Sequence, residues 1–311
     1  MTFLASLNAM LADHELAQYR DLDERHPVIH VLGLPRSGTT LALQLIAAHT
    51  DVAYIDHVAA AFWRAPTIGL RLSSDLQRQL PRTSSYESNH GRTATLTEPH
   101  EFSYLWSSLF GLEFGLESLV QPDPDHVIDW ANVKRVITNM CAVVERPLAF
   151  KSFHVIWHLQ RLCETLPRTV VVLIRREPLT VAQSLVRMRE SLYGSREAWA
   201  SVRPREYAQL KDEHYATQIA GQIFHVNRVL AEGCRFVPAQ GLVEVTYDEL
   251  CRSPRSFVDR VAEAVSLQGG EVRVTSPPPA SFPRRDEQLD PGTVEELRAA
   301  LERFGVRPDQ A

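Results

Sequence analysis

Residues 28–49, VIHVLGLPRSGTTLALQLIAAH, carry the strongest fold signal in the chain. A run of β-branched and aliphatic residues leads to a turn bounded by Gly33 and Gly38, and an apolar segment follows. The pattern predicts a strand, a tight loop and a helix, whose first N–H groups and dipole attract an anion. We therefore expect the loop to bind a phosphate-bearing ligand through Pro35, Arg36, Ser37, Gly38, Thr39 and Thr40.

The loop differs from the ATP-binding sequence GxxxxGK[ST] at one informative position. Both glycines keep the spacing, but Thr39 stands where the lysine would be, and the cation of the loop is Arg36. In ATP-dependent enzymes that lysine faces the β and γ phosphates, and the next hydroxyl holds magnesium. A planar guanidinium suits a terminal group of anionic oxygens bound without metal. We therefore expect a metal-independent site.

Composition narrows the class of protein. The 311 residues are 44% hydrophobic and 23% charged with a net charge of -5, which is typical of a globular protein and predicts a single domain over residues 1–311. A mildly acidic chain is a poor nucleic-acid partner. No basic leader and no long apolar run is present, so we expect a cytoplasmic protein without membrane contact. The sequence does not indicate an oligomeric state.

Apolar runs alternate with helical patterns along the rest of the chain. Strands are expected at 52–55, 147–151, 169–175 and 242–247, and helices at 2–20, 156–166, 179–192, 205–232, 254–267 and 294–304. This alternation predicts an α/β fold, a P-loop-type three-layer sandwich with a central parallel sheet flanked by helices. The weakly patterned segment at about 60–145 is expected to be helical and variable, and to bind the acceptor.

A second motif, VVVLIRREPLTVAQSL, spans residues 170–185. Arg176 follows the expected strand, and Ser184 lies about two helical turns further on. Open parallel sheets bind ligands beside the carboxyl ends of their strands, so both side chains are expected to meet at one phosphate. Charge-assisted hydrogen bonds from such a pair would favour the phosphorylated ligand by about 10²-fold or more.

The two motifs together resemble a known family. GLPRSGTTL, residues 33–41, resembles the 5'-phosphosulfate loop of sulfotransferases that use 3'-phosphoadenosine 5'-phosphosulfate (PAPS), in the branch related to tyrosylprotein sulfotransferases. Arg176 and Ser184 fit the family signature that holds the 3'-phosphate. The resemblance covers roughly residues 28–58, 98–110 and 147–265. It implies PAPS as donor, 3',5'-ADP as product, and transfer to a hydroxyl or amine of a small molecule.

Further segments resemble other parts of that family's site. AFKSFHVIWHLQRL, residues 149–162, resembles the segment whose lysine approaches the sulfuryl group, which gives Lys151 that role beside Arg36. Phe153 departs from the proline that the family often has. VEVTYDELCRSP, residues 243–254, resembles a strand end that makes Tyr247 a candidate cofactor contact.

The C-terminal part of the chain departs further from the pattern. The glycine-rich clamp of the cytosolic branch is missing. Arg284 and Arg285 either substitute for it or form a solvated basic pair.

Sulfuryl transfer needs a general base, for which the sequence offers several candidates. AHTDVAYID, residues 48–56, aligns with a stretch that delivers a catalytic glutamate in tyrosylprotein sulfotransferases, so Asp56 is the first choice. His57 is a rival because histidine titrates nearer neutrality. TEPHEFSYLW, residues 97–106, resembles a bacterial pocket element. The further candidates are Glu98, His100, Glu101 and His154.

Two other functions share part of this pattern. A P-loop small-molecule kinase would need a cation at position 39 and a metal-binding acid after a strand, whereas this chain has Thr39 and VVLIRR. A non-catalytic protein that binds 3'-phosphoadenosine nucleotides remains the second alternative. The acceptor pocket is also left open, because the aromatic residues of the middle segment fit either a pocket or the core: Trp63, Tyr104, Trp106 and Phe110.

Overall fold

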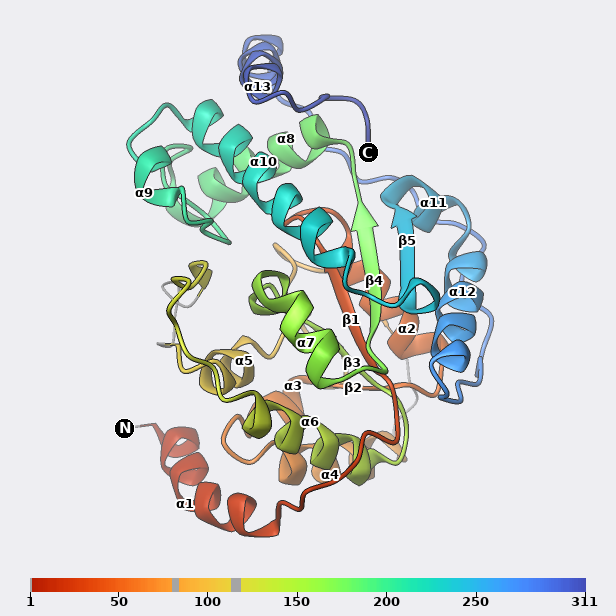
Figure 1. Cartoon of the computed structure of the whole chain (residues 1–311). Coiled ribbons are helices and arrows are strands. Elements are labelled where there is room, and N and C mark those ends of the chain that lie inside the picture. Colours follow the sequence, from red (N-terminus) through yellow and green to blue (C-terminus); the bar gives the residue numbers. More distant parts are fainter. Residues whose placement is uncertain (1, 80–83, 113–118) are drawn as a thin grey trace.

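Strand β1 (Val28–Gly33) is the centre of a parallel sheet (Figure 1). The computed structural model describes residues 2–79, 84–112 and 119–311. Within them the sheet has five strands in the order β2-β3-β1-β4-β5. Its other strands are β2 (Ala53–Tyr54), β3 (Leu148–Lys151), β4 (Val170–Arg175) and β5 (Leu242–Thr246). The predicted α/β sandwich with a central parallel sheet is confirmed.

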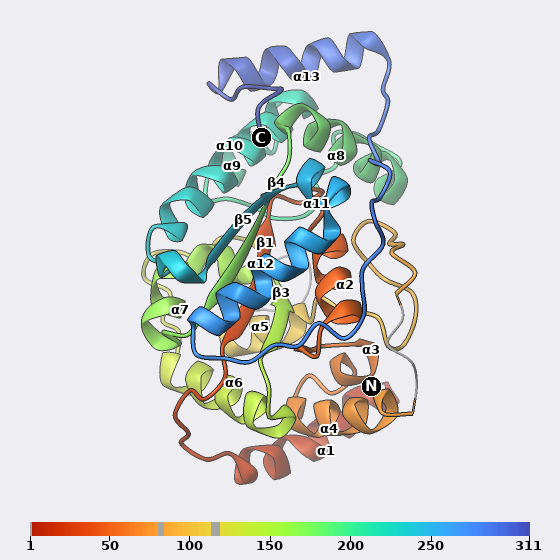
Figure 2. The same cartoon turned by 90° about the vertical axis from the view of Figure 1, so that its right-hand side faces the viewer.

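Helices cover both faces of the sheet, which is why its strands read as apolar runs (Figure 2). Ile29 and Val31 of β1 face the layer formed by α2 (Thr39–His49) and α12 (Pro254–Leu267). Val28 and Leu32 face the opposite layer. That layer includes α7 (Leu159–Thr165) and α10 (Tyr215–Cys234). Alternate residues of one strand therefore anchor the two helical layers.

The remaining elements lie at the two ends of the sheet. Helices α8 (Pro178–Tyr193) and α13 (Pro291–Arg303) pack with α10 beyond the carboxyl end of β4 (Figure 1). Helices α1 (Phe3–Gln18), α4 (Pro66–Gln77) and α6 (Trp130–Val144) gather at the other end. The short elements are α3 (His57–Ala60), α5 (Ser103–Leu109), η2 (His154–His158), α9 (Tyr207–Leu210), η3 (Ala239–Gly241) and α11 (Tyr247–Arg252).

The structure corrects two of the expected elements. The helix expected at 205–232 is two helices, α9 and α10. Tyr247 begins α11 instead of ending β5, because Thr246 and Glu249 form a capping box there.

The first helix buries polar residues, while large apolar residues on it are exposed. Phe3 and Met10 are exposed, whereas Asn8 and Glu15 are buried. Glu15 accepts a 2.8 Å hydrogen bond from the backbone nitrogen of Thr67, in the first turn of α4. Polar contacts with the start of α4 therefore fix α1. No helix of the described residues combines the length and apolar character that a membrane span requires.

Candidate active site

The carboxyl ends of β1, β3, β4 and β5 meet at one edge of the sheet, and each brings a predicted residue there. Loop 34–38 follows β1, Lys151 ends β3, Arg176 follows β4 and Tyr247 follows β5. A cavity of about 300 Å³ opens between them. The predicted residues that line it are Pro35, Arg36, Gly38, Thr39, Thr40, Glu101, Lys151, Arg176, Ser184 and Tyr247.

The loop after β1 presents an uncapped helix start to this cavity. Gly38 is the N-cap of α2 at φ +105°, and within the described chain no side chain caps the helix. A side chain at position 38 would overlap the ring of Tyr247, which lies directly against it. The Ser37 hydroxyl is buried and has no hydrogen-bond partner among the described residues. Ser37 itself does not line the cavity, so the first N–H groups of α2 are the groups suited to hold an anion there.

The two predicted nucleotide motifs are in direct contact. Nε of Arg36 donates a 3.0 Å hydrogen bond to Oγ of Ser184, and Nη1 of Arg176 donates one of 2.7 Å to the Arg36 carbonyl. The Arg176 guanidinium lies 4.1 Å from the centre of the Tyr247 ring. Burial lowers the pKa of Arg36, and the neighbouring Arg176 charge lowers it further. An anionic ligand between the two guanidinium groups would relieve this repulsion.

The segment 282–287 forms another part of the cavity wall. Arg285 lines the cavity and accepts a hydrogen bond from Nη2 of Arg176 at its carbonyl. Arg284 pairs with Glu177 at 3.2 Å and with Asp286 at 3.0 Å. Arg284 is therefore held by carboxylates, whereas the Arg285 side chain is exposed at the cavity wall. Arg176 also pairs with Asp286 at 2.9 Å, a contact with no signal in the sequence.

Lys151 is buried at the other end of the cavity. Its side chain is 7% exposed, and its Nζ lies 3.5 Å from Oε2 of Glu101. The carbonyl of Gly91 lies 3.5 Å from Nζ and accepts a 3.3 Å hydrogen bond from the Thr40 hydroxyl. Gly91 has a φ of +86°, and an added Cβ would lie 3.4 Å from Nζ. That distance is an ordinary contact, so the positive φ and not the space is what favours glycine at this position.

Asp56 lies outside the cavity lining, in a structural position. It is the N-cap of α3 and accepts a 2.8 Å hydrogen bond from the backbone nitrogen of Ala59. Ser73 donates at 2.6 Å and Gln77 at 2.9 Å to its other oxygen. Asp56 is only 1% exposed, so it is buried within this network. Its predicted role as the base stays a prediction that this placement does not favour.

Glu98 also lies behind the cavity wall. Its Oε1 accepts hydrogen bonds from the Ser85 backbone and hydroxyl, both at 2.9 Å, from the Ser84 hydroxyl at 3.0 Å and from Gln44 at 3.2 Å. Burial alone would raise the pKa of Glu98, but these donors outweigh burial and lower it. The carboxylate therefore anchors the loop that carries Tyr86 into the cavity.

The histidine candidates lie outside the cavity lining as well. His57 contacts the Thr93 hydroxyl at 3.0 Å. His154 is buried, with ring nitrogens 3.1 Å from the Ser107 hydroxyl and 3.3 Å from the Ser152 hydroxyl. His100 is not in the lining either, and burial, followed by the charges of His57 and Lys151, lowers its pKa to about 4.

The aromatic candidates for an acceptor pocket belong mainly to the core. Trp106 and Phe110 are buried and pack against each other with ring centres 5.5 Å apart. Tyr104 is half exposed and lies 6.0 Å from Trp63. None of these four side chains lines the cavity.

Several lining residues had no recognisable sequence signal. Loop 86–91 contributes Tyr86, Ser88, His90 and Gly91. Ser201 enters the cavity at φ +67°. The amide of Gln222 fixes this second loop by donating to the Ala200 and Val202 carbonyls at 2.9 and 2.7 Å. Long-range packing of this kind leaves no local pattern.

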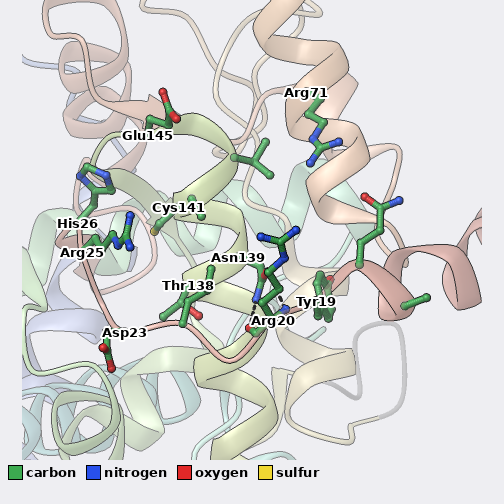
Figure 3. A pocket seen from close by; sticks show the side chains of 15 residues that line it. Tyr19, Arg20, Asp23, Arg25, His26, Arg71, Thr138, Asn139, Cys141 and Glu145 are labelled. Atoms are coloured by element: carbon green, nitrogen blue, oxygen red, sulfur yellow. Dashed lines mark hydrogen bonds between the residues drawn. The ribbon is translucent and has the colours of Figure 1, made fainter.

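A second cavity, of about 770 Å³, lies at the opposite end of β1 (Figure 3). The side chains of Arg20 and Arg71 point into it, and Asp23 and Glu145 also line it. The buried amide of Asn139 holds the backbone of Arg20 through hydrogen bonds of 3.1 and 2.7 Å. None of the predicted catalytic or nucleotide-binding residues reaches this cavity, so the smaller one is the candidate site.

Comparisons with known proteins agree with the architecture. A model of the Sulfotransferase family matches residues 27–269. The crystal structure of sulfotransferase STF1 from Mycobacterium tuberculosis H37Rv is similar with a TM-score of 0.55 and 17% identity, covering 96% of this chain and 83% of that one. The crystal structure of sulfotransferase STF9 from Mycobacterium avium is similar with a TM-score of 0.53 and 17% identity, covering 96% of this chain and 72% of that one. At such identities the likeness shows the fold. No curated protein matches this chain in sequence.

Proposed function

Since this chain belongs to the sulfotransferase family, we propose that it transfers a sulfuryl group from PAPS to a hydroxyl or amine of a small-molecule acceptor. One observation carries the proposal. The loop after β1, the pair Arg176 and Ser184, and Lys151 line the same cavity. The family makes the chain a transferase, and the residues of this cavity support PAPS as the donor.

The cavity residues fit a nucleotide that is anionic at both ends. Arg176, which lines the cavity, has a buried Nε without a hydrogen-bond partner among the described residues, which is costly unless a ligand supplies one. The first turn of α2, with Arg36, would hold the 5'-phosphosulfate. Arg176 and Ser184 would hold the 3'-phosphate. The Tyr247 ring packs directly on Gly38, which leaves no room for a side chain at this point of the loop.

Arg36 and Lys151 are the cations that we assign to the transfer step. PAPS would supply the sulfuryl group, and negative charge would build up on its bridging oxygen as the group leaves. Both side chains line the cavity, and Lys151 is buried, so solvent screens its charge poorly. Preorganised groups of this kind typically lower the barrier by about 3–4 kcal/mol each.

We assign the general base to Glu101. Among the predicted acid-base candidates of the described chain, it is the one that lines the cavity. Its contact with Nζ of Lys151 at 3.5 Å orients the carboxylate, and its side chain is 26% exposed, which leaves room for an acceptor. A carboxylate oxygen of Glu101 would take the proton from the acceptor hydroxyl.

The acceptor side of the cavity supports a role for the middle segment in substrate selection. Residues 86–101 contribute hydroxyl, imidazole and carboxylate groups to the wall, whereas the expected aromatic residues are not in it. A polar wall beside a small cavity suits a small hydroxylated metabolite. The segment at about 60–145 is therefore our proposed acceptor-binding region.

Calorimetry with 3',5'-ADP, ADP and ATP, each with and without magnesium, tests the proposal. We expect metal-independent binding of 3',5'-ADP, about 10²-fold tighter than that of ADP. Magnesium-dependent binding of ATP instead would identify a kinase. Binding of 3',5'-ADP without any product from PAPS across a panel of hydroxyl and amine acceptors would identify a non-catalytic nucleotide-binding protein.

A further inference from the structure

Asp286 pairs with Arg176 beside the cavity, although Asp286 is not one of the residues that line it. Its Oδ1 accepts a 2.9 Å hydrogen bond from Nη2 of Arg176, whose side chain is 6% exposed. Its Oδ2 accepts a 3.0 Å hydrogen bond from Nε of Arg284. A carboxylate held between two guanidinium groups makes the same charge-assisted contacts as a phosphate.

The surroundings make this contact replaceable. Arg284 also pairs with Glu177 at 3.2 Å and with Asp248 at 3.4 Å, so three carboxylates surround Arg284. Burial alone would raise the pKa of Asp286, but the hydrogen bonds from Arg176 and Arg284 outweigh burial and lower it. Asp286 is therefore ionised at neutral pH, and its side chain is 39% exposed. It can leave Arg176 while Arg284 still holds its other oxygen.

We propose that Asp286 occupies the 3'-phosphate position on Arg176 in the nucleotide-free protein, and that a 3'-phosphorylated nucleotide binds by exchanging this carboxylate for its own phosphate. The inference rests on the proposed function, because that function assigns the 3'-phosphate to Arg176. A dianionic phosphate that reaches Nη2 of Arg176 would repel the carboxylate, so the two anions do not share that nitrogen.

This exchange makes Asp286 a competitor that lowers the affinity for 3'-phosphorylated nucleotides alone. A nucleotide without a 3'-phosphate leaves the pair of Arg176 and Asp286 intact, so its affinity does not depend on the carboxylate. A nucleotide with the phosphate must displace it. The segment that carries Asp286 also contributes Phe282, Arg285 and Glu287 to the cavity wall, so the exchange rearranges that wall as the donor binds.

The test compares Asp286→Asn with wild type by metal-free calorimetry with 3',5'-ADP and ADP. Asparagine keeps the size of the side chain and removes its charge. We expect 3',5'-ADP to bind about tenfold more tightly and ADP to change by less than about twofold, since the displaced charge-assisted bond is partly exposed. In the Arg176→Ala background the same substitution should give no gain.

Asp248→Asn is the matched control. It removes one charge from the same group of acids around Arg284 but does not contact Arg176. An equal gain in this variant, or unchanged or weaker 3',5'-ADP binding in Asp286→Asn, would overturn the inference and leave the proposed function standing. A wild-type chain that shows no preference for 3',5'-ADP over ADP would overturn both.

Discussion

Arg36 and Ser184, 148 positions apart in the chain, are joined by a 3.0 Å hydrogen bond from Nε to Oγ. This bond connects the loop after β1 with α8, which follows β4. Arg176 adds a second connection through the Arg36 carbonyl. The residues assigned to the two ends of the nucleotide therefore form one hydrogen-bonded unit before any ligand arrives.

We expect Arg36→Ala and Ser184→Ala to weaken 3',5'-ADP binding in a non-additive way. Each removes one partner of the same charge-assisted bond, so the double variant should lose less than the sum of the single losses. A coupling free energy of about 1 kcal/mol or more is expected from a double-mutant cycle measured by calorimetry. Losses that add within about 0.5 kcal/mol would show that the two side chains act independently.

Lys151→Met should lower turnover far more than nucleotide affinity. Methionine keeps most of the side-chain volume but removes the charge assigned to the transfer step. We expect kcat to fall by about 10²–10³-fold, while the Kd for 3',5'-ADP changes little. Steady-state kinetics and calorimetry on the same preparation measure the two effects. Equal losses in both would make Lys151 a binding group only.

Glu101→Gln and Asp56→Asn should separate catalysis from stability. Glutamine at 101 cannot accept the acceptor's proton, so we expect turnover to be lost with little change in Tm.

Asparagine at 56 would place an NH₂ group against the donors Ser73 and Gln77, which should cost about 1–3 kcal/mol of unfolding free energy. The folded fraction should retain turnover. Loss of turnover in a stably folded Asp56→Asn protein would return the base to Asp56.

Gly38→Ala should damage both stability and nucleotide binding. The new methyl group would overlap the Tyr247 ring in a backbone conformation that favours glycine. Gly194→Ala is the matched control, because Gly194 has a φ of +66° with no atom within 4 Å of an added Cβ. We expect a cost of about 1 kcal/mol from conformation in the control and a larger loss in Gly38→Ala. Equal Tm shifts would exclude the contact with Tyr247.

Acidification should destabilise the protein through His30. Burial lowers the pKa of His30 to about 3, and neither ring nitrogen has a hydrogen-bond partner in the described chain. In the unfolded chain the pKa of this ring is about 6.5, so between pH 3 and pH 6.5 the unfolded state binds a proton on His30 that the folded state does not. The stability that the neutral ring contributes is complete above pH 6.5 and is lost as the pH falls towards 3. At pH 5 the expected loss is about 2 kcal/mol.

Urea unfolding of wild type and His30→Leu at pH 7.5 and pH 5 measures this contribution. The variant should lose less stability than wild type between the two pH values. A smaller dependence should remain, because burial also lowers the pKa of His100 and of His158 to about 4. If His30→Leu lost as much unfolding free energy as wild type between pH 7.5 and pH 5, His30 would not control the acid response.

Local patterns were sufficient for most of the fold. The apolar runs predicted the strands to within about two residues, because a strand covered on both faces must be apolar throughout. The expected loop and helix at residues 34–49 followed from two glycines and an apolar periodicity. The break between α9 and α10 was missed. Helix α9 ends at Leu210 and α10 begins at Tyr215, after His214 with a ψ of 141°.

The choice among the acid-base candidates required the folded chain. Asp56 and Glu101 both sit in segments that resemble the family's site, but Asp56 is held by three donors of α3 and α4, whereas Glu101 faces Lys151. Sequence position cannot distinguish a carboxylate that caps a helix from one that lines a cavity.

The sequence by itself determined the parallel sheet, the glycine-bounded loop before α2 and the residues that follow each strand, because these depend on periodicity and on short spacings. Only the tertiary structure decided which of those residues meet. The contact of Asp286 with Arg176 and the approach of Gly91 to Lys151 join segments 110 and 60 residues apart, and their hydrogen bonds form only when separate loops close over the same sheet edge.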